Sequence, residues 1–267
     1  MIATQDRMLT APALTTAGLQ ALFRGEIIAY RIPRFAPPAR CRVWSNALRK
    51  SRPFQRYANA PDVPVYRSGM TLFEAANRPE LLADYFQRAE QTHATIEKLL
   101  HGDNPLRLLQ ETLDANWPQG ACRQRWRGYY LNPGILRSFA SDSTGGLPPH
   151  VDTLFKDLPT STAAYQIKTQ LAANLYLQTP ERGGVLHIWP YEPTADELEW
   201  LRVGHHDFLD ASKLGRQPIE LRPATGELIL FRSSCVHAVT RVTRGQRTTA
   251  SCFIGYYGET NPLRCWA

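Results

Sequence analysis

The chain has 267 residues, of which 43% are hydrophobic and 21% are charged. These proportions are ordinary for a globular protein and exclude a low-complexity or disordered chain. The net charge of +7 comes from scattered arginines rather than from a lysine-rich run, so the concentrated basic face of a nucleic-acid-binding protein is not expected.

The five cysteines are an odd number and form no C-x-x-C pair, which indicates reduced thiols. The first residues, MIATQDRMLTAPALTTAG, are too polar for a secretory signal, and no apolar run reaches the length of a membrane span. We therefore expect a cytoplasmic protein with no membrane partner. The sequence makes no prediction of its oligomeric state.

The first part of the chain has a helical and irregular pattern. Residues 15–33 predict a short helix and then a strand, EIIAYRI, whereas residues 36–68 are proline-rich with one short helix, CRVWSNALRK. From Thr71 to about Leu113, apolar residues recur every three to four positions, which predicts helices interrupted at Gly102. Residues 1–119 are thus predicted to be a support region.

After residue 119 the pattern changes to short β-like runs separated by glycine and proline. The runs are RWRGYYL, GILRSFA, PPHVDTL, YQIKTQLAANLYLQ, GGVLHIW, IELRPATGELILF, CVHAVTRVT and RTTASCFIGYYG. One helix, TADELEWLRVG, interrupts them. This order predicts a single α+β domain over 1–267, with a β-sandwich or open-barrel core in 120–260 and an N-terminal helical layer packed on it.

Two segments place a histidine near an aspartate. In His150-Val151-Asp152, a strand would point both side chains to one side, about 7 Å apart. His205-His206-Asp207 has a similar spacing, but it follows a predicted helix in a polar connection and is interpreted as an ordinary loop. The first motif alone is weak, because chance produces an H-x-D in many chains.

Downstream residues strengthen the first motif. His237 lies on a later predicted strand, and two histidines with one carboxylate form the facial triad that favours Fe(II) and leaves other coordination positions open. Arg247 follows ten residues later, and a guanidinium is the natural partner of a carboxylate co-substrate. Thr249 alternates onto the same strand face as Arg247.

The ordered set HVD, ERGGVLHIW, PATGELILF and HAVTRVTRGQRTTAS resembles the Fe(II)/2-oxoglutarate-dependent oxygenases of the prolyl-hydroxylase-like type, over residues 120 to 260. The resemblance implies a double-stranded β-helix, or jelly roll, that uses Fe(II), 2-oxoglutarate and O2. It implies His150, Asp152 and His237 as iron ligands and Arg247 as the partner of the distal carboxylate of 2-oxoglutarate. Thr249, Asn174 and Tyr176 are candidates for further contacts with the same co-substrate.

Further residues are candidates for the substrate site. Arg137 occurs where a strand should approach the metal, and Trp189 lies beside the Gly-Gly strand. The segment SDSTGGLPP, residues 141–149, has the glycines and small polar residues of a loop that folds over substrate. His187 is interpreted as structural.

These observations together predict a dioxygenase that hydroxylates a small molecule. The resemblance is strongest to the branch that acts on free amino acids and other small metabolites, a branch that also contains chlorinating members. Because Asp152 is a carboxylate where those members carry a small residue, hydroxylation is expected. Desaturation, cyclisation, a carrier-tethered or peptide substrate, and a metal-binding or sensing jelly roll without turnover stay open as alternatives.

Overall fold

The computed structural model describes residues 7–51, 54–57, 65–75, 78–140, 145–154, 166–204 and 207–267. The helices of these residues are α1 (Thr16–Arg24), α2 (Pro38–Ser51), α3 (Leu72–Ala75), α4 (Pro79–Leu99), α5 (Pro105–Asn116) and α7 (Ala195–Leu201). None of the described helices combines the length and the apolar character that a membrane crossing requires.

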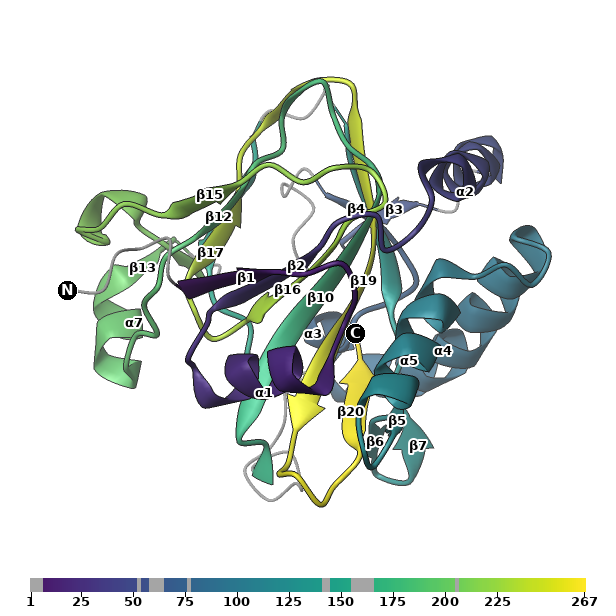
Figure 1. The fold of residues 1–267 in the computed structure, drawn as a ribbon, viewed down its shortest axis with the longest axis horizontal. Coiled ribbons are helices and arrows are strands. Elements are labelled where there is room, and N and C mark those ends of the chain that lie inside the picture. The colour runs from purple at the N-terminus through teal and green to yellow at the C-terminus, as the bar shows by residue number, and fades with distance from the viewer. Residues whose placement is uncertain are drawn as a thin grey trace.

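A large, mostly antiparallel sheet runs through the centre of the molecule (Figure 1). Its strands, in spatial order, are β1 (Met8–Thr10), β2 (Ala29–Ile32), β16 (Leu228–Arg232), β10 (Thr169–Gln178), β19 (Gln246–Tyr256), β8 (Ile135–Ala140), β4 (Tyr66–Ser68) and β3 (Gln55–Arg56). Beyond the part of β19 that pairs with β8, the same strand pairs with β20 (Leu263–Trp266), which in turn pairs with β5 (Ala121–Arg123).

A smaller sheet contains β15 (Ile219–Leu221), β12 (Leu186–Ile188), β17 (His237–Val239) and β9 (Leu147–His150), in that order. Short ribbons complete the strands: β6 (Arg125–Trp126) with β7 (Tyr129–Tyr130), β11 (Arg182–Gly183) with β18 (Val242–Arg244), and β13 (Arg202–Val203) with β14 (Phe208–Leu209).

The two main sheets share one apolar core. Tyr176 and Phe231 of the large sheet pack in the same buried cluster as Leu186, Ile188 and Val239 of the small sheet. Alternation along each strand sends one set of side chains into this space and the other set to the opposite face. The space between the sheets is therefore where inward-facing polar residues would be brought together.

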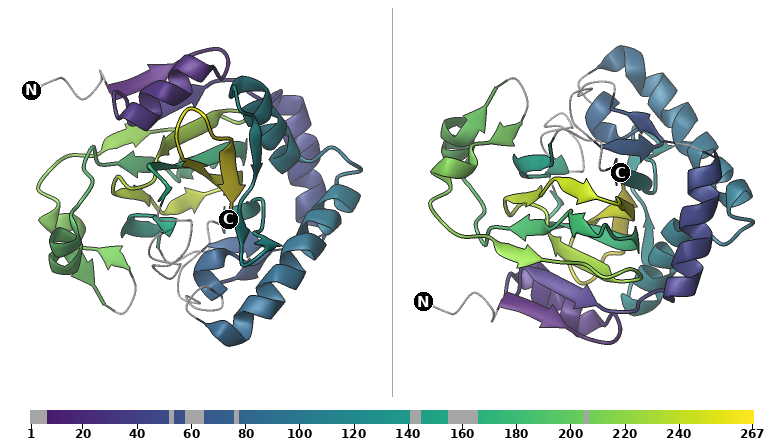
Figure 2. Two further views of the ribbon diagram at one scale, coloured as in Figure 1. Left: turned by 90° about the horizontal axis from the view of Figure 1, so that it is seen from below. Right: turned by 90° about the horizontal axis from the view of Figure 1, so that it is seen from above.

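Helices cover the opposite face of the large sheet, and α2, α4 and α5 lie along one side of the molecule (Figure 2). Leu22 of α1, Trp44 of α2 and Leu109 of α5 pack there with Leu175 and Leu230 of the sheet. Asn104 caps α5 by accepting from the Leu106 N–H, and Pro105 takes the first helical position, where no amide donor is needed. The mixed α/β fold predicted from the sequence is confirmed.

The N-terminal region differs from the prediction in one respect. The expected strand EIIAYRI is present as β2, but residues before 119 also supply β1, β3 and β4 to the large sheet. These strands have two or three residues each, too short for an alternating pattern to be visible in the sequence. The region thus builds part of the β layer as well as the helical cover.

Candidate metal and co-substrate site

The pairing of β9 with β17 brings two distant histidines together. His150, the last residue of β9, lies opposite His237, the first residue of β17, and their ring centroids are 4.2 Å apart. β9 is the edge strand of the small sheet and contains Pro148 and Pro149. Proline lacks an amide donor, so such a segment is tolerated at a sheet edge and ends the sheet there.

Asp152 completes the group from a position just beyond the strand. Its amide donates to the Ser233 carbonyl oxygen at 2.9 Å, and its own carbonyl oxygen accepts from Ser233 Oγ at 2.9 Å. The expected alternation along one strand is therefore wrong in detail, because β9 ends at His150. Bonds to the loop of Ser233, rather than strand geometry, orient the Asp152 carboxylate.

The three side chains could share one ion. Asp152 Oδ2 lies 3.3 Å from His237 Nε2 and 3.8 Å from His150 Nε2, and the three ligand atoms lie within 4.8 Å of one another. Donors on one face of an octahedral ion, with bonds of about 2.1 Å, are about 3 Å apart. Small side-chain movements would complete such a face.

Backbone contacts set the tautomer of both imidazoles. His150 Nδ1 lies 2.8 Å from the Pro148 carbonyl oxygen, and His237 Nδ1 lies 2.9 Å from the Cys235 carbonyl oxygen. A carbonyl oxygen can only accept, so each Nδ1 carries the proton and donates it. Both Nε2 lone pairs are then left for a metal ion, the usual arrangement of metal-binding histidines.

The electrostatics of the group favour the metal-binding protonation states. Burial, reinforced by His237, lowers the pKa of His150 to about 4, so this imidazole is neutral near pH 7. Burial alone would raise the pKa of Asp152, but His150, His237 and Arg137 outweigh it and hold that pKa below its usual range. A neutral imidazole beside an ionised carboxylate needs no deprotonation to bind a divalent cation.

A small buried chamber of about 30 Å³ adjoins these residues. Its lining residues are Arg137, Phe139, Leu147, His150, Asp152, Ala172, Asn174, Leu186, Phe231, His237, Val239 and Arg247.

Arg247 is the prominent cation of this chamber and is only 3% exposed. One of its Nη atoms donates to the Tyr176 hydroxyl at 3.2 Å, and the guanidinium lies over the Phe139 and Tyr176 rings. Its Nε is buried with no hydrogen-bond partner, and no described carboxylate forms an ion pair with it. A buried guanidinium with an unsatisfied donor fits a carboxylate ligand.

The other predicted co-substrate residues lie on the same inner face. Register pairs Tyr176 with Thr249 and Asn174 with Ser251, next to Arg247 on β19. Ser251 Oγ donates to Asn174 Oδ1 at 2.7 Å and lies 3.0 Å from Thr249 Oγ1. Sequence reasoning missed Ser251, although the alternation from Arg247 through Thr249 leads directly to it.

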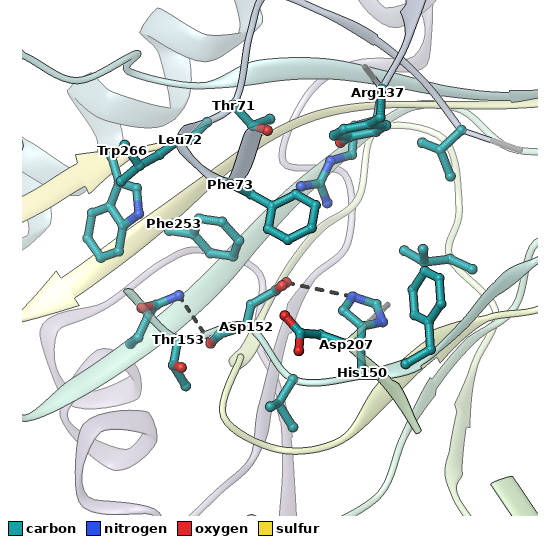
Figure 3. Close-up of a pocket in the computed structure, with 17 residues that line it drawn as sticks. Thr71, Leu72, Phe73, Arg137, His150, Asp152, Thr153, Asp207, Phe253 and Trp266 are labelled. Atoms are coloured by element: carbon teal, nitrogen blue, oxygen red, sulfur yellow. Dashed lines mark hydrogen bonds and ion pairs between the residues drawn. The ribbon is translucent and has the colours of Figure 1, made fainter. Parts of the chain in front are cut away.

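A larger pocket of about 120 Å³ adjoins His150 and Asp152 of the candidate metal-binding group, and Arg137 lines both cavities (Figure 3). The aromatic residues Phe73, Phe253 and Trp266 form part of its wall. Tyr57, Val65, Thr71 and Leu72 come from the N-terminal region and were not foreseen, because that segment has no motif and its contribution depends on tertiary packing.

None of the remaining described candidate residues lines the small chamber. Trp189 lies outside both cavities, in an apolar cluster with Val236, and its indole N–H donates to the Arg216 carbonyl oxygen at 2.9 Å. His187 Nε2 lies 3.7 Å from a Glu220 carboxylate oxygen, consistent with a structural role. Asp207 lines the larger pocket, but His205, His206 and residues 141–144 of the predicted lid lie outside the described residues.

The fold and the site define a class: two facing sheets hold a two-histidine-one-carboxylate group beside a buried arginine. A family model, the 2OG-Fe(II) oxygenase superfamily, matches residues 136–255. The chain is 25% identical over 251 residues to an L-gamma-glutamyl-L-propargylglycine hydroxylase of Streptantibioticus cattleyicolor, covering 92% of this chain and 90% of that protein. It is 30% identical over 126 residues to a PKHD-type hydroxylase of Acidovorax ebreus, covering 46% of this chain and 43% of that protein.

Solved structures show the same fold. An N-substituted L-amino acid dioxygenase of Burkholderia ambifaria superposes with a TM-score of 0.66 at 18% identity, covering 94% of this chain and 91% of that one. Its complex with alpha-KG gives a TM-score of 0.61 at the same identity and coverage. Residues 136–255 thus match the 2OG-Fe(II) oxygenase superfamily, and the chain is an enzyme that uses iron and 2-oxoglutarate.

Proposed function

We propose that His150, Asp152 and His237 bind Fe(II) and that Arg247 binds the distal carboxylate of 2-oxoglutarate. The observation that carries this proposal is the buried Arg247 Nε, which lacks a partner in a chamber that the three candidate ligands also line. A cation in such a place is costly unless a ligand anion pairs with it. Tyr176 positions the guanidinium through the 3.2 Å hydrogen bond.

Asn174 and Thr249 complete the proposed co-substrate site. Their side chains are joined through Ser251, so their polar groups are held on the inner face before any ligand arrives. A preorganised polar surface of this kind lowers the cost of ordering side chains on binding. Thr249 is 1% exposed and acts mainly by fixing Ser251 and Asn174.

We further propose that the two sheets are the halves of a double-stranded β-helix, formed by residues 120–260. The shared core of Tyr176 and Phe231 with Leu186, Ile188 and Val239 supports this interpretation. In this arrangement residues 1–119 are a support region of the same single domain, 1–267. They add strands at the edges of the large sheet and helices on its outer face.

The proposed reaction is hydroxylation of an unactivated C–H bond of a small metabolite, such as a free amino acid or a derivative, with release of succinate and CO2. Iron and 2-oxoglutarate, when bound, supply the activation of O2 for this chemistry. The names of two relatives support the substrate class, since one hydroxylates a glutamyl dipeptide and the other oxidises N-substituted amino acids.

The protein's own groups would orient the substrate and exclude water. Apolar side chains such as Phe73, Phe253 and Trp266 line the larger pocket, and His150 and Asp152 face it from another side. Asp152 fills the third protein position on the ion. A carboxylate there leaves no vacancy for a halide, which supports hydroxylation rather than halogenation.

Anaerobic titration with Fe(II) and 2-oxoglutarate tests the proposed site. We expect a weak visible charge-transfer band in the wild type and its loss in His150→Ala and His237→Ala. His187→Ala is the matched control, because this imidazole faces Glu220 outside both cavities, and it should keep the band. An absent band in the wild type, or an unchanged band in both ligand variants, would contradict the assignment.

A screen of succinate release then tests the substrate class. Free amino acids and their N-acyl or dipeptide derivatives should give succinate in proportion to hydroxylated product. Coupled turnover with carrier-bound or peptide substrates alone would reject the small-metabolite assignment while leaving the iron site intact.

A further inference from the structure

Arg137 occupies an unusual position for a charged residue. It lies on β8, opposite Thr249 of β19, and its side chain lines both the co-substrate chamber and the larger pocket. Figure 3 shows the guanidinium directed into the pocket near Phe73, on the side away from Asp152 and His150. Arg137 is thus the cation shared by the two cavities.

A neighbouring arginine shows what a structural role looks like in this sheet. Arg67 of β4 lies directly across from Arg137 in the strand register. Arg67 Nε donates to Glu74 Oε2 at 2.9 Å and an Nη of Arg67 donates to Glu74 Oε1, so this buried guanidinium holds its carboxylate through both oxygens. The hydrogen bonds of Arg67 to Glu74 therefore hold α3 against β4.

Arg137 has no such partner among the described residues. Its Nε is buried without a hydrogen bond, and no described carboxylate forms an ion pair with it. Burial lowers the pKa of Arg137, but Tyr57, which lines the same pocket, lies close enough to the guanidinium to raise it. Asp152 is near enough to affect Arg137 electrostatically, but its carboxylate points to the two histidines. The Arg137 side chain thus lines the pocket and keeps one donor, Nε, without a hydrogen-bond partner.

From this geometry we infer that Arg137, with Tyr57 beside it, binds a carboxylate of the substrate, so that the substrate class is apolar carboxylic acids. This inference rests on the proposed oxygenase function and specifies its substrate. A guanidinium matches a carboxylate through two parallel hydrogen bonds, and a phenol hydroxyl can donate a third. The apolar remainder of the substrate packs against Phe73, Phe253 and Trp266.

Arg247 and Arg137 differ in the cavities that their side chains reach. Arg247 is 3% exposed and lies in the small chamber only, whereas Arg137 also faces the larger pocket. Because Arg247 is confined to the small chamber and Arg137 also reaches the larger pocket, the enzyme could hold two different carboxylates at once. Arg137 is accordingly a specificity-determining residue, and its neutral variants should change substrate choice rather than co-substrate affinity.

The test compares acids with their neutral analogues in the Fe(II)- and 2-oxoglutarate-loaded enzyme under anaerobic conditions. The probes are L-leucine, L-phenylalanine and N-acetyl-L-leucine, each with its carboxamide, and binding is read from the perturbation of the visible band. In the wild type, at least one acid should bind about 100-fold more tightly than its amide. In Arg137→Met this preference should fall to a few-fold at most, and Arg137→Lys should retain part of it.

Controls separate this role from others. Arg222→Gln removes an exposed charge outside both cavities and should leave the acid preference unchanged. Fe(II) and 2-oxoglutarate titrations of Arg137→Met should match the wild type, and circular dichroism checks that it folds. Tyr57→Phe keeps the ring and should lower the acid preference by a smaller factor, which provides a test even if Arg137→Met fails to fold.

Each contrary result has a distinct meaning. Amides that bind as well as acids in the wild type, or no acid that perturbs the band, would overturn the inference. Equal loss of acid and amide binding in Arg137→Met would show a merely structural residue, and a matching loss of 2-oxoglutarate would place Arg137 in the co-substrate site. An absent band in the wild type would instead refute the proposed function itself.

Discussion

At the scale of single residues, the site depends on buried charges that lack a full set of protein partners. Among the described residues, the Arg247 guanidinium has one hydrogen-bond partner, Tyr176, and it lies over two aromatic rings. Stacking fixes the plane of the guanidinium without satisfying all of its donors. This arrangement preserves hydrogen-bonding capacity for a ligand at the cost of stability in its absence.

Arg247→Met is therefore expected to weaken 2-oxoglutarate binding about 100-fold, since it removes charge-assisted hydrogen bonds of about 1.5 to 3 kcal/mol. The affinity for Fe(II) alone should change little, because the ligand atoms belong to other residues. Calorimetric titration with each ligand measures both effects. Arg244→Gln, which removes an exposed arginine paired with Glu181, should leave both affinities unchanged. Equal losses of iron and 2-oxoglutarate in Arg247→Met would contradict the assigned role.

At the scale of elements, the position of β9 against β17 determines where the two histidines meet. Gly146 precedes β9 at a point where an added Cβ would lie 2.1 Å from the Val239 carbonyl oxygen. Backbone atoms cannot move aside as a flexible side chain can, so only glycine allows this approach. At the neighbouring Gly145, an added Cβ would meet no heavy atom of the described residues within 4 Å.

Gly146→Ala should therefore push β9 away from β17, destabilise the protein by about 1 to 3 kcal/mol and weaken Fe(II) binding. Gly145→Ala, one residue earlier, is the matched control and should have little effect on either quantity. Thermal unfolding and anaerobic Fe(II) titration of the two variants provide the comparison. Similar behaviour of the two variants would show that the contact at Gly146 does not set the position of β9.

The short helix α3 depends on a buried ion pair. Glu74 accepts hydrogen bonds from Arg67 and from the Thr71 amide and hydroxyl, and the pair is almost fully buried. The same helix carries Leu72 and Phe73 into the wall of the larger pocket. The ion pair thus supports the pocket wall from behind.

Glu74→Gln should destabilise the protein by about 3 to 5 kcal/mol, because it leaves the Arg67 charge buried without its counter-charge. Glu26→Gln, at an exposed pair with Arg24, should cost no more than about 1 kcal/mol. Urea unfolding gives both free energies of unfolding. A loss in Glu74→Gln no larger than that in Glu26→Gln would indicate that water or local rearrangement satisfies Arg67.

At the scale of the whole molecule, ligands that bind only the folded state should raise its stability. At a free concentration one hundred times the Kd, 2-oxoglutarate with iron contributes about 2.7 kcal/mol. For a chain of this size that corresponds to a rise in Tm of about 5 to 10 °C. Differential scanning calorimetry with and without the ligands measures it. Arg247→Met should lose most of the increment due to 2-oxoglutarate at the same ligand concentration, and an undiminished increment would contradict its role.

The sequence predicted some parts of this molecule much better than others, for physical reasons. His150, Asp152, His237 and Arg247 could be proposed from the sequence because iron and carboxylate chemistry requires particular residue types in a fixed order, and the fold brings all four to one chamber. The larger pocket could not, since Tyr57 and Phe73 are ordinary residues whose role depends on where the N-terminal region packs. The position of Trp189 depends on the path that the chain takes after β12, where it enters an apolar cluster. Residue types alone do not determine that path.

The strand order has a consequence for how the protein is made. β2 pairs with β16 through Ala29 and Phe231, residues about 200 positions apart, and β10 pairs with β19, which carries Arg247. Contacts between such distant segments slow folding, because a long loop must close before they can form. During synthesis, the chain that has emerged before residue 228 contains β2 without β16. The proposed metal-binding group therefore assembles late in translation, and incomplete chains should neither bind iron nor consume 2-oxoglutarate.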